Sequence, residues 1–191
     1  MLFRSVRLVE WRRLRPEFFV SINVSPRQFR DLDLAERLIE ELDQAGLVGA
    51  AVELEVTEGL LLSGRSELME SLERLRDHGV GLVMDDFGTG YASLSYLRDY
   101  PFSSIKIDRS FVEGMDSDSR KRKLVTSAIR LARALDLTVI AEGVETREEL
   151  EVLLTEKCDL AQGFLFSRAM DPERLAEQLA AEPGEAVRSA T

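Results

Sequence analysis

The sequence predicts an α/β fold, an incomplete (β/α)8 barrel of the TIM type with about six βα units, and three observations lead to it. Apolar runs of strand length alternate with amphipathic segments of helical length, which is typical of a parallel sheet with right-handed crossovers. Six strand candidates in succession carry a polar side chain at or just beyond their carboxyl ends. The chain has 191 residues, whereas a complete barrel typically needs about 250.

The strand candidates are short runs rich in Val, Ile, Leu and Phe. An open doubly wound sheet competes with the barrel, but the first strand is followed by Asn23-Val24-Ser25-Pro26 and not by a glycine-rich phosphate loop. Asp85-Asp86-Phe87-Gly88-Thr89-Gly90 also lacks the GxGxxG spacing. The six candidates span 18–23, 52–56, 80–85, 104–108, 138–142 and 160–164.

Helical periodicity fills the segments between these strands. We expect the segment 32–45 to end at Gly46 as a C-cap. The segment 118–135 is expected to face the core with Leu124, Ala128, Leu131 and Leu135. The remaining helix candidates are 2–14, 67–78, 147–155 and 172–181. The domain organisation is therefore an N-terminal helix (1–16), a partial barrel (17–181) and a flexible tail (182–191).

Composition and charge exclude several classes of protein. Lys and Arg total 25 and Asp and Glu total 35, so the net charge is −10, which disfavours a protein that binds bulk nucleic acid. The one cysteine, Cys158, cannot form an internal disulfide and suits a reducing cytoplasm. No apolar run approaches the roughly 20 residues of a membrane span.

Polar side chains at the strand ends predict one shared site. Alone, each would be read as a helix cap, a turn residue or an ion pair, but the carboxyl ends of barrel strands converge on one mouth. Several carboxylates in one cavity need a compensating cation, and oxygen ligands favour Mg²⁺ or Mn²⁺ over zinc. Adjacent aspartates could bridge two such ions. The residues are Asn23, Glu55, Asp85, Asp86, Lys106, Glu142 and Gln162.

Six segments, in order, resemble the EAL domain, the bacterial phosphodiesterase family that opens cyclic di-GMP to linear pGpG. They are Asn23-Val24-Ser25, Glu53-Leu54-Glu55-Val56-Thr57-Glu58, Asp85-Asp86-Phe87-Gly88-Thr89-Gly90, Ile105-Lys106-Ile107-Asp108, Glu142-Gly143-Val144-Glu145 and Gln162-Gly163-Phe164. The order of these segments disfavours an unrelated metal-dependent β/α hydrolase.

The resemblance implies a modified barrel with two Mg²⁺ or Mn²⁺ ions and a role for each matching residue. Lys106 would steady the attacking water or the phosphate oxygens, while Gln162 and Glu145 would form hydrogen bonds around the site. The ions would be held by Asn23, Glu55 and Asp85 for one, and by Asp85, Asp86 and Glu142 for the other.

The resemblance also implies a mobile loop that links the metal site to a dimer interface. The loop spans 87–94 and includes Phe87, Gly88, Thr89 and Gly90, and Glu58 would anchor it. The unpaired edges of an incomplete barrel lead us to expect a homodimer, a domain swap or a rearranged sheet.

The sequence departs from the family in lacking the Glu-Ala-Leu-x-Arg segment, which supplies a metal ligand and a substrate contact. We therefore expect impaired hydrolysis of cyclic di-GMP in the cytoplasm. The alternative is a catalytically inactive domain that binds cyclic di-GMP or mediates protein interaction or dimerisation.

Overall fold

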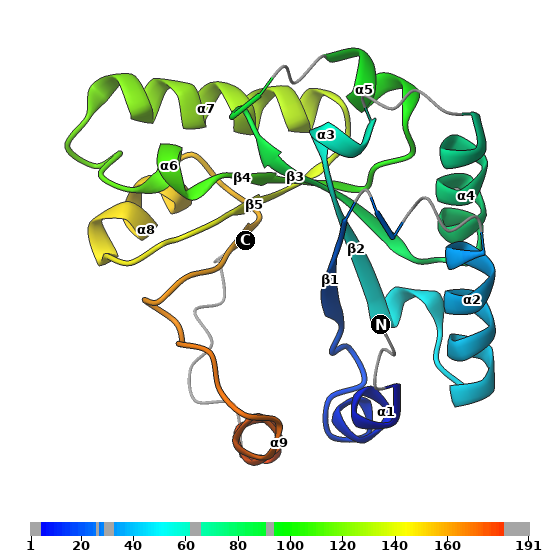
Figure 1. The fold of residues 1–191 in the computed structure, drawn as a ribbon. Coiled ribbons are helices and arrows are strands. Elements are labelled where there is room, and N and C mark those ends of the chain that lie inside the picture. The colour runs from blue at the N-terminus through cyan, green and yellow to red at the C-terminus, as the bar shows by residue number, and fades with distance from the viewer. Residues whose placement is uncertain (1–4, 26, 29–32, 62–65, 91–93, 182–191) are drawn as a thin grey trace.

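The computed structural model of the chain describes residues 5–25, 27–28, 33–61, 66–90 and 94–181. Its centre is a six-stranded parallel sheet in the order β1-β2-β3-β4-β5-β6 (Figure 1). Neighbours in the sheet follow the order of the chain without reversal, as in a barrel and unlike a doubly wound sheet. The outer edges of β1 and β6 pair with no other strand in the part of the chain that is described.

The strands form where the sequence predicts them, with small differences at their ends. β6 is the shortest of the described strands. The bounds are β1 (Val20–Val24), β2 (Val52–Thr57), β3 (Gly81–Phe87), β4 (Ser104–Ile107), β5 (Thr138–Ala141) and β6 (Leu160–Ala161).

The long helices are confirmed, and four short ones were not predicted because three to six residues carry too little periodicity. Gly46 ends α2 in the left-handed conformation, as expected. The first residues of the segment 2–14 and the tail 182–191 lie outside the described residues. The helices are α1 (Ser5–Leu14), α2 (Leu34–Ala45), η1 (Gly49–Ala51), α3 (Glu58–Leu61), α4 (Ser66–Asp77), α5 (Leu94–Asp99), α6 (Arg109–Val112), α7 (Ser119–Ala134), α8 (Arg147–Thr155) and α9 (Pro172–Ala180).

The apolar face predicted for α7 is partly wrong. Leu124 and Leu135 are 49% and 40% exposed, whereas Val125, Ile129 and Ala132 are buried. Both stripes have helical spacing, so periodicity alone could not choose between them. Packing against the sheet determines which stripe is buried, and the buried stripe lies one position further along the helix than the predicted one.

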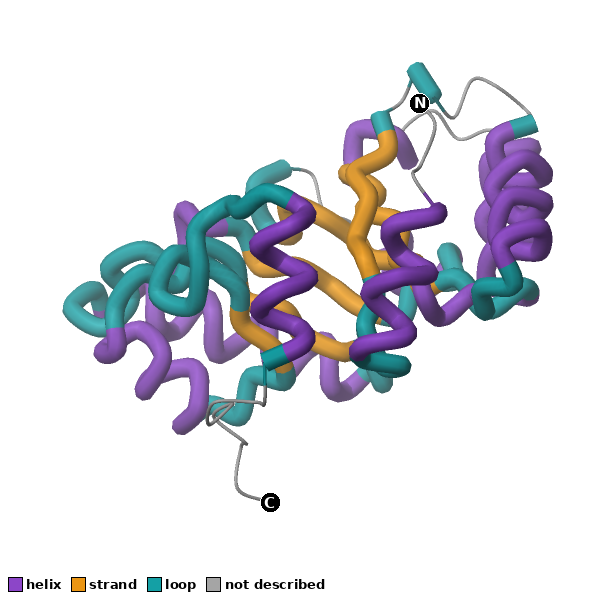
Figure 2. The backbone as a smooth tube through the Cα atoms, turned by 90° about the horizontal axis from the view of Figure 1, so that it is seen from below, coloured by secondary structure: helices purple, strands orange, loops and turns teal. Residues whose placement is uncertain are grey.

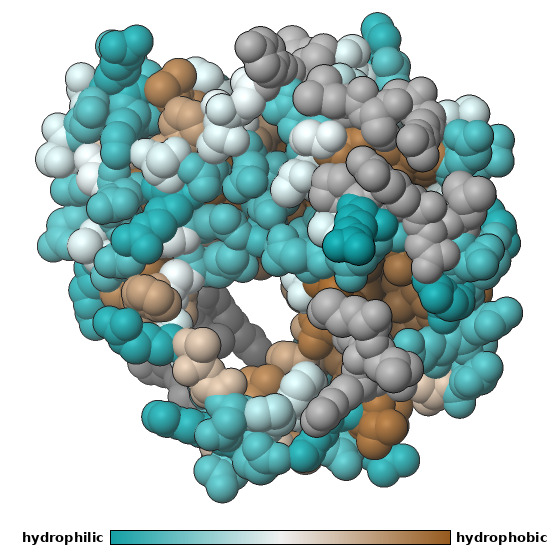
Figure 3. Space-filling view, in the orientation of Figure 1, coloured by the Kyte–Doolittle hydropathy of each residue, from teal (hydrophilic) through white to brown (hydrophobic). Residues whose placement is uncertain are grey.

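The inner side of the curled sheet is spanned by the first and last helices. Arg7 of α1 pairs with Glu173 of α9 at 2.6 Å, and Arg15 Nη2 donates to the Ala181 carbonyl at 2.8 Å. Figure 2 shows these two helices in front of the strands. The space-filling view shows an opening between this pair and the sheet (Figure 3). No described helix is long and apolar enough to cross a membrane.

Candidate functional site

Alternate residues of the central strands serve two different faces of the sheet. Leu54, Leu82 and Ile105 join the apolar core beneath the outer helices. Their strand neighbours Glu55 and Lys106 are also buried, but strand geometry directs them to the opposite, inner face. The regular strands thus bring polar side chains together without interrupting the core.

A cluster of five side chains forms on this inner face, and we call it the Lys106 cluster. Lys106 Nζ lies 2.8 Å from Glu55 Oε1 and 3.8 Å from Asp85 Oδ1, and it forms a third ion pair with Glu142. Gln162 Nε2 donates to Glu142 Oε1 at 2.8 Å. Three successive strands, β2 to β4, and the residues that follow β5 and β6 therefore meet at one place.

The Lys106 cluster is short of positive charge. Burial alone would lower the pKa of the Lys106 ammonium, but hydrogen bonds to Glu142 and Glu55 outweigh this and raise the pKa. Lys106 therefore stays protonated, yet one ammonium faces three carboxylates. Asp85 Oδ1 is buried and accepts no hydrogen bond. A buried carboxylate oxygen that accepts no hydrogen bond is costly, and the ammonium of Lys106 lies 3.8 Å away, so this atom marks where a further cation or donor is needed.

Asp86 leaves the strand pattern through a bulge. The pairing of β3 with β4 shifts register between Met84 and Phe87, and Asp86 has a φ of 56° in the left-handed region. Burial, followed by the charge of Asp85, raises the pKa of Asp86. The bulge thus keeps two adjacent carboxylates near one another, where regular pleating would point them to opposite faces.

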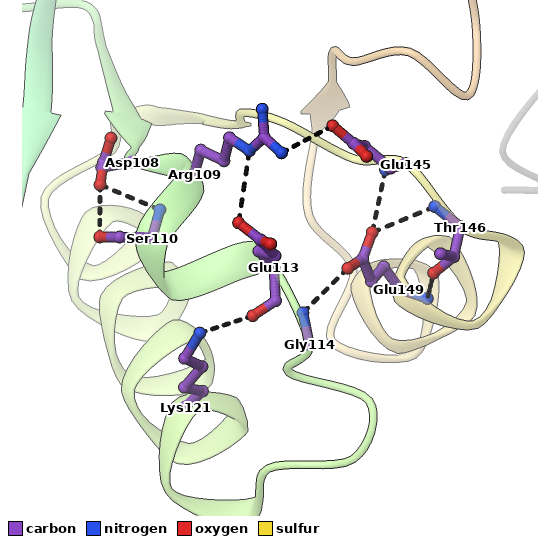
Figure 4. A network of polar contacts seen from close by, with 9 residues as sticks. All are labelled: Asp108, Arg109, Ser110, Glu113, Gly114, Lys121, Glu145, Thr146 and Glu149. Carbon is purple, nitrogen blue, oxygen red and sulfur yellow. Dashed lines mark hydrogen bonds and ion pairs between the residues drawn. The ribbon is translucent and has the colours of Figure 1, made fainter.

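Two predicted site residues lie at the margin of the cluster. Asn23 is exposed on β1 and is the register partner of Glu55. Glu145 Oε1 pairs with Arg109 Nη2 at 2.8 Å, so its carboxylate is engaged by that guanidinium (Figure 4).

The predicted loop and its anchor are in contact. A Cβ on Gly90 would lie only 2.6 Å from Glu58 Oε2, so the loop backbone lies directly against that carboxylate. Glu58 Oε1 is buried and unpartnered, and burial raises the pKa of Glu58. Thr89 Oγ1 donates to the Asp86 carbonyl at 2.9 Å. This segment therefore connects the second aspartate to Glu58, while residues 91–93 lie outside the described part.

The donor types of the site fit a divalent cation, although the side chains are not gathered around one. Among the described residues, no group of three or more Asp, Glu, His or Cys side chains is arranged to hold a metal ion. Lys106 occupies the centre that the carboxylates share. The unpartnered Asp85 Oδ1 and the all-oxygen donor set nevertheless suit Mg²⁺ or Mn²⁺.

Two residues near the site were missed from the sequence. Arg109 follows β4 and reaches both Glu145 and Glu113. Glu149 is a buried carboxylate of α8 that accepts backbone hydrogen bonds from two loops. The spacing Thr146-x-x-Glu149 could have indicated a capping box, but nothing in the sequence indicated the contact of Glu149 with a second loop.

Several known proteins are similar to this chain in sequence. The family model described as the EAL domain matches residues 2–169. The chain is 41% identical over 178 residues to the cyclic di-GMP phosphodiesterase NbdA of Pseudomonas aeruginosa, covering 93% of this chain and 22% of that protein. It spans about a fifth of the length of several other curated relatives.

Solved structures are similar at the level of the fold and the sequence. The EAL domain of Mycobacterium smegmatis DcpA superposes with a TM-score of 0.84 and 35% identity, covering 92% of this chain and 81% of that one. The Klebsiella pneumoniae BlrP1 complex with manganese and cyclic di-GMP has a TM-score of 0.76 and 34% identity, covering 86% of this chain and 43% of that one.

Proposed function

Because the chain belongs to the EAL domain family, we propose that it acts on cyclic di-GMP by metal-dependent hydrolysis of a phosphodiester bond, which gives linear pGpG. The observation that carries the proposal is the Lys106 cluster, in which a buried ammonium, three carboxylates and an amide meet at the strand ends. The names of similar proteins support the substrate.

The proposed reaction is a substitution at phosphorus. An oxygen–phosphorus bond forms from water, one ester bond from phosphorus to a sugar oxygen breaks, and that leaving oxygen takes up a proton. The protonated Lys106 supplies fixed positive charge and N–H donors at this edge, where charge develops on the phosphate oxygens. Gln162 holds the Glu142 carboxylate in place through its amide.

The proposed metal ligands are oxygen donors at the strand ends. One or two divalent cations bound there would neutralise phosphate charge and make water more acidic. Burial and the unpartnered oxygen of Asp85 support this assignment. The proposed ligands are Asn23, Glu55, Asp85, Asp86 and Glu142.

A weaker second candidate is binding of cyclic di-GMP without turnover. Two observations favour it: the 191 residues contain no Glu-Ala-Leu segment, and Lys106 already pairs with Glu55 and Glu142. We accordingly propose that hydrolysis by these 191 residues is slower than that of a family member that contains this segment.

Two further proposals concern the setting of the domain. The edges of β1 and β6, which no described strand covers, support a homodimer or domain-swapped oligomer. A single free cysteine and a nucleotide substrate support a cytoplasmic location.

The test is incubation of the purified chain with Mn²⁺ and cyclic di-GMP, with chromatographic detection of pGpG. We expect product that chelation by EDTA abolishes and that Asp85→Asn reduces. The exposed Asp136→Asn is the matched control, because it changes a remote aspartate. Binding without product would select the second candidate, and absence of both would reject the proposed function. Light scattering of the same sample tests the oligomer, which a strictly monomeric chain would exclude.

A further inference from the structure

The loop between β5 and α8, residues 142–146, is held from one side by Glu149. Glu149 is only 3% exposed. Its Oε2 accepts N–H bonds from Glu145 at 2.9 Å and from Thr146 at 3.1 Å, while its Oε1 accepts the Gly114 N–H at 2.9 Å (Figure 4). One carboxylate therefore joins this loop to the turn that follows α6.

The same loop begins at Glu142, whose side chain belongs to the Lys106 cluster. Its middle is held by the residue that follows the last strand, because the Val144 N–H donates to the Gln162 carbonyl at 3.0 Å. Arg109 crosses it at Gly143, where a Cβ would come within 2.4 Å of the Arg109 side chain. The loop thus has few ways to shift without moving the Glu142 carboxylate.

Capping of α8 explains only half of what Glu149 does. A capping box requires its N3 carboxylate to accept the N–H of the cap residue, here Thr146. The bond to Gly114 reaches a residue 35 positions away and contributes nothing to the cap. Glu149 therefore fixes the loop against α6, the helix that carries Arg109.

We propose that Glu149 is a positioning residue, which holds the loop 142–146 so that the Glu142 carboxylate faces Lys106 and Gln162. Its role in catalysis rests on the proposed function, since it acts only through Glu142. Loss of a group that orients a ligand carboxylate typically lowers metal affinity or activity about 10–100-fold.

The first test reads the position of Glu142 without requiring activity. The side-chain amide of Gln162 donates to Glu142, so its two N–H signals in a ¹⁵N NMR spectrum report that contact. Glu149→Gln keeps the size of the side chain but turns one acceptor into a donor. Thr146→Ala is the matched control, because it removes the other half of the same cap and leaves the Gly114 contact. We expect Glu149→Gln to shift the Gln162 signals and Thr146→Ala to leave them in place. Unshifted signals in Glu149→Gln, or equal shifts in both variants, would overturn the proposal.

The second test measures Mn²⁺ affinity and steady-state kinetics of the same variants. We expect Glu149→Gln to weaken Mn²⁺ binding and to lower kcat by about 10–100-fold, with a smaller change in KM than in kcat. A loss confined to KM, or an equal loss in Thr146→Ala, would show that Glu149 only caps the helix. If the unaltered chain makes no pGpG, the proposed function fails, whereas the Gln162 signals still decide the role of Glu149.

Discussion

The two faces of the sheet differ in what their side chains do. The outer face contributes apolar residues such as Leu54, Leu82 and Ile105 to a core covered by helices. The inner face contributes Glu55 and Lys106, which are buried equally deeply but form an ionic cluster. Adjacent residues of one strand therefore serve stability and chemistry separately. Substitutions on the two faces should differ in whether Mn²⁺ restores the stability that is lost.

The largest effect is expected from Lys106→Met. Removing the ammonium leaves three carboxylates facing one another at the inner face, and breaking a buried pair costs about 3–5 kcal/mol. Urea unfolding followed by circular dichroism measures the loss, with the exposed Lys123→Met as control. Mn²⁺ should raise the Tm of Lys106→Met more than that of the unaltered chain. A variant as stable as the control would mean that the inner face contributes no ionic stabilisation.

A comparable but purely apolar effect is expected from Leu82→Ala on the outer face. Leu82 is 1% exposed, and such a truncation costs about 2–5 kcal/mol because it leaves a cavity. Mn²⁺ should not restore this loss. Leu124→Ala is the control, since Leu124 is 49% exposed. If Leu124→Ala lowered the free energy of unfolding as much as Leu82→Ala does, Leu124 would lie on a buried face of α7, as its periodicity predicted.

A smaller effect, dependent on pH, is expected from Glu149→Gln. Burial alone would raise the pKa of Glu149, but hydrogen bonds from Gly114, Glu145 and Thr146 outweigh it and hold the pKa below its ordinary value. The ionised group therefore stabilises the fold fully at pH values above the ordinary pKa of a glutamate, and the contribution is lost as the pH falls through the lowered pKa. We expect Glu149→Gln to be about 1.5–3 kcal/mol less stable at neutral pH. Unfolding curves from neutral pH downward should converge for the two proteins, and a difference that grows with acid would contradict this.

The smallest effect is expected at Cys158, which precedes β6. Its reactivity tests whether the apolar packing of the outer face extends to the last strand. Burial raises the pKa of the Cys158 thiol to about 11, and its side chain packs against the core. Alkylation by iodoacetamide near pH 8 should therefore be about 100-fold slower in the folded chain than in urea, as the thiolate fraction requires. Equal rates would show that the last strand is not packed as the others are.

Much of the site could be predicted because strand ends in a parallel sheet share one edge. Glu55, Lys106, Glu142 and Gln162 meet as the strand order requires. The carboxylate of Glu145, in contrast, forms an ion pair with Arg109. Sequence spacing does not show which of several nearby cations a surface carboxylate will reach.

The sequence by itself determined the strands, the main helices and the order in which polar residues arrive at the sheet edge. These follow from local periodicity and from the short connections between neighbours. Only the tertiary structure decided which stripe of α7 is buried, the bulge at Asp86, and the reach of Glu149 to Gly114 across 35 positions. Each of these depends on contacts between segments that are distant along the chain, and no local pattern encodes such contacts.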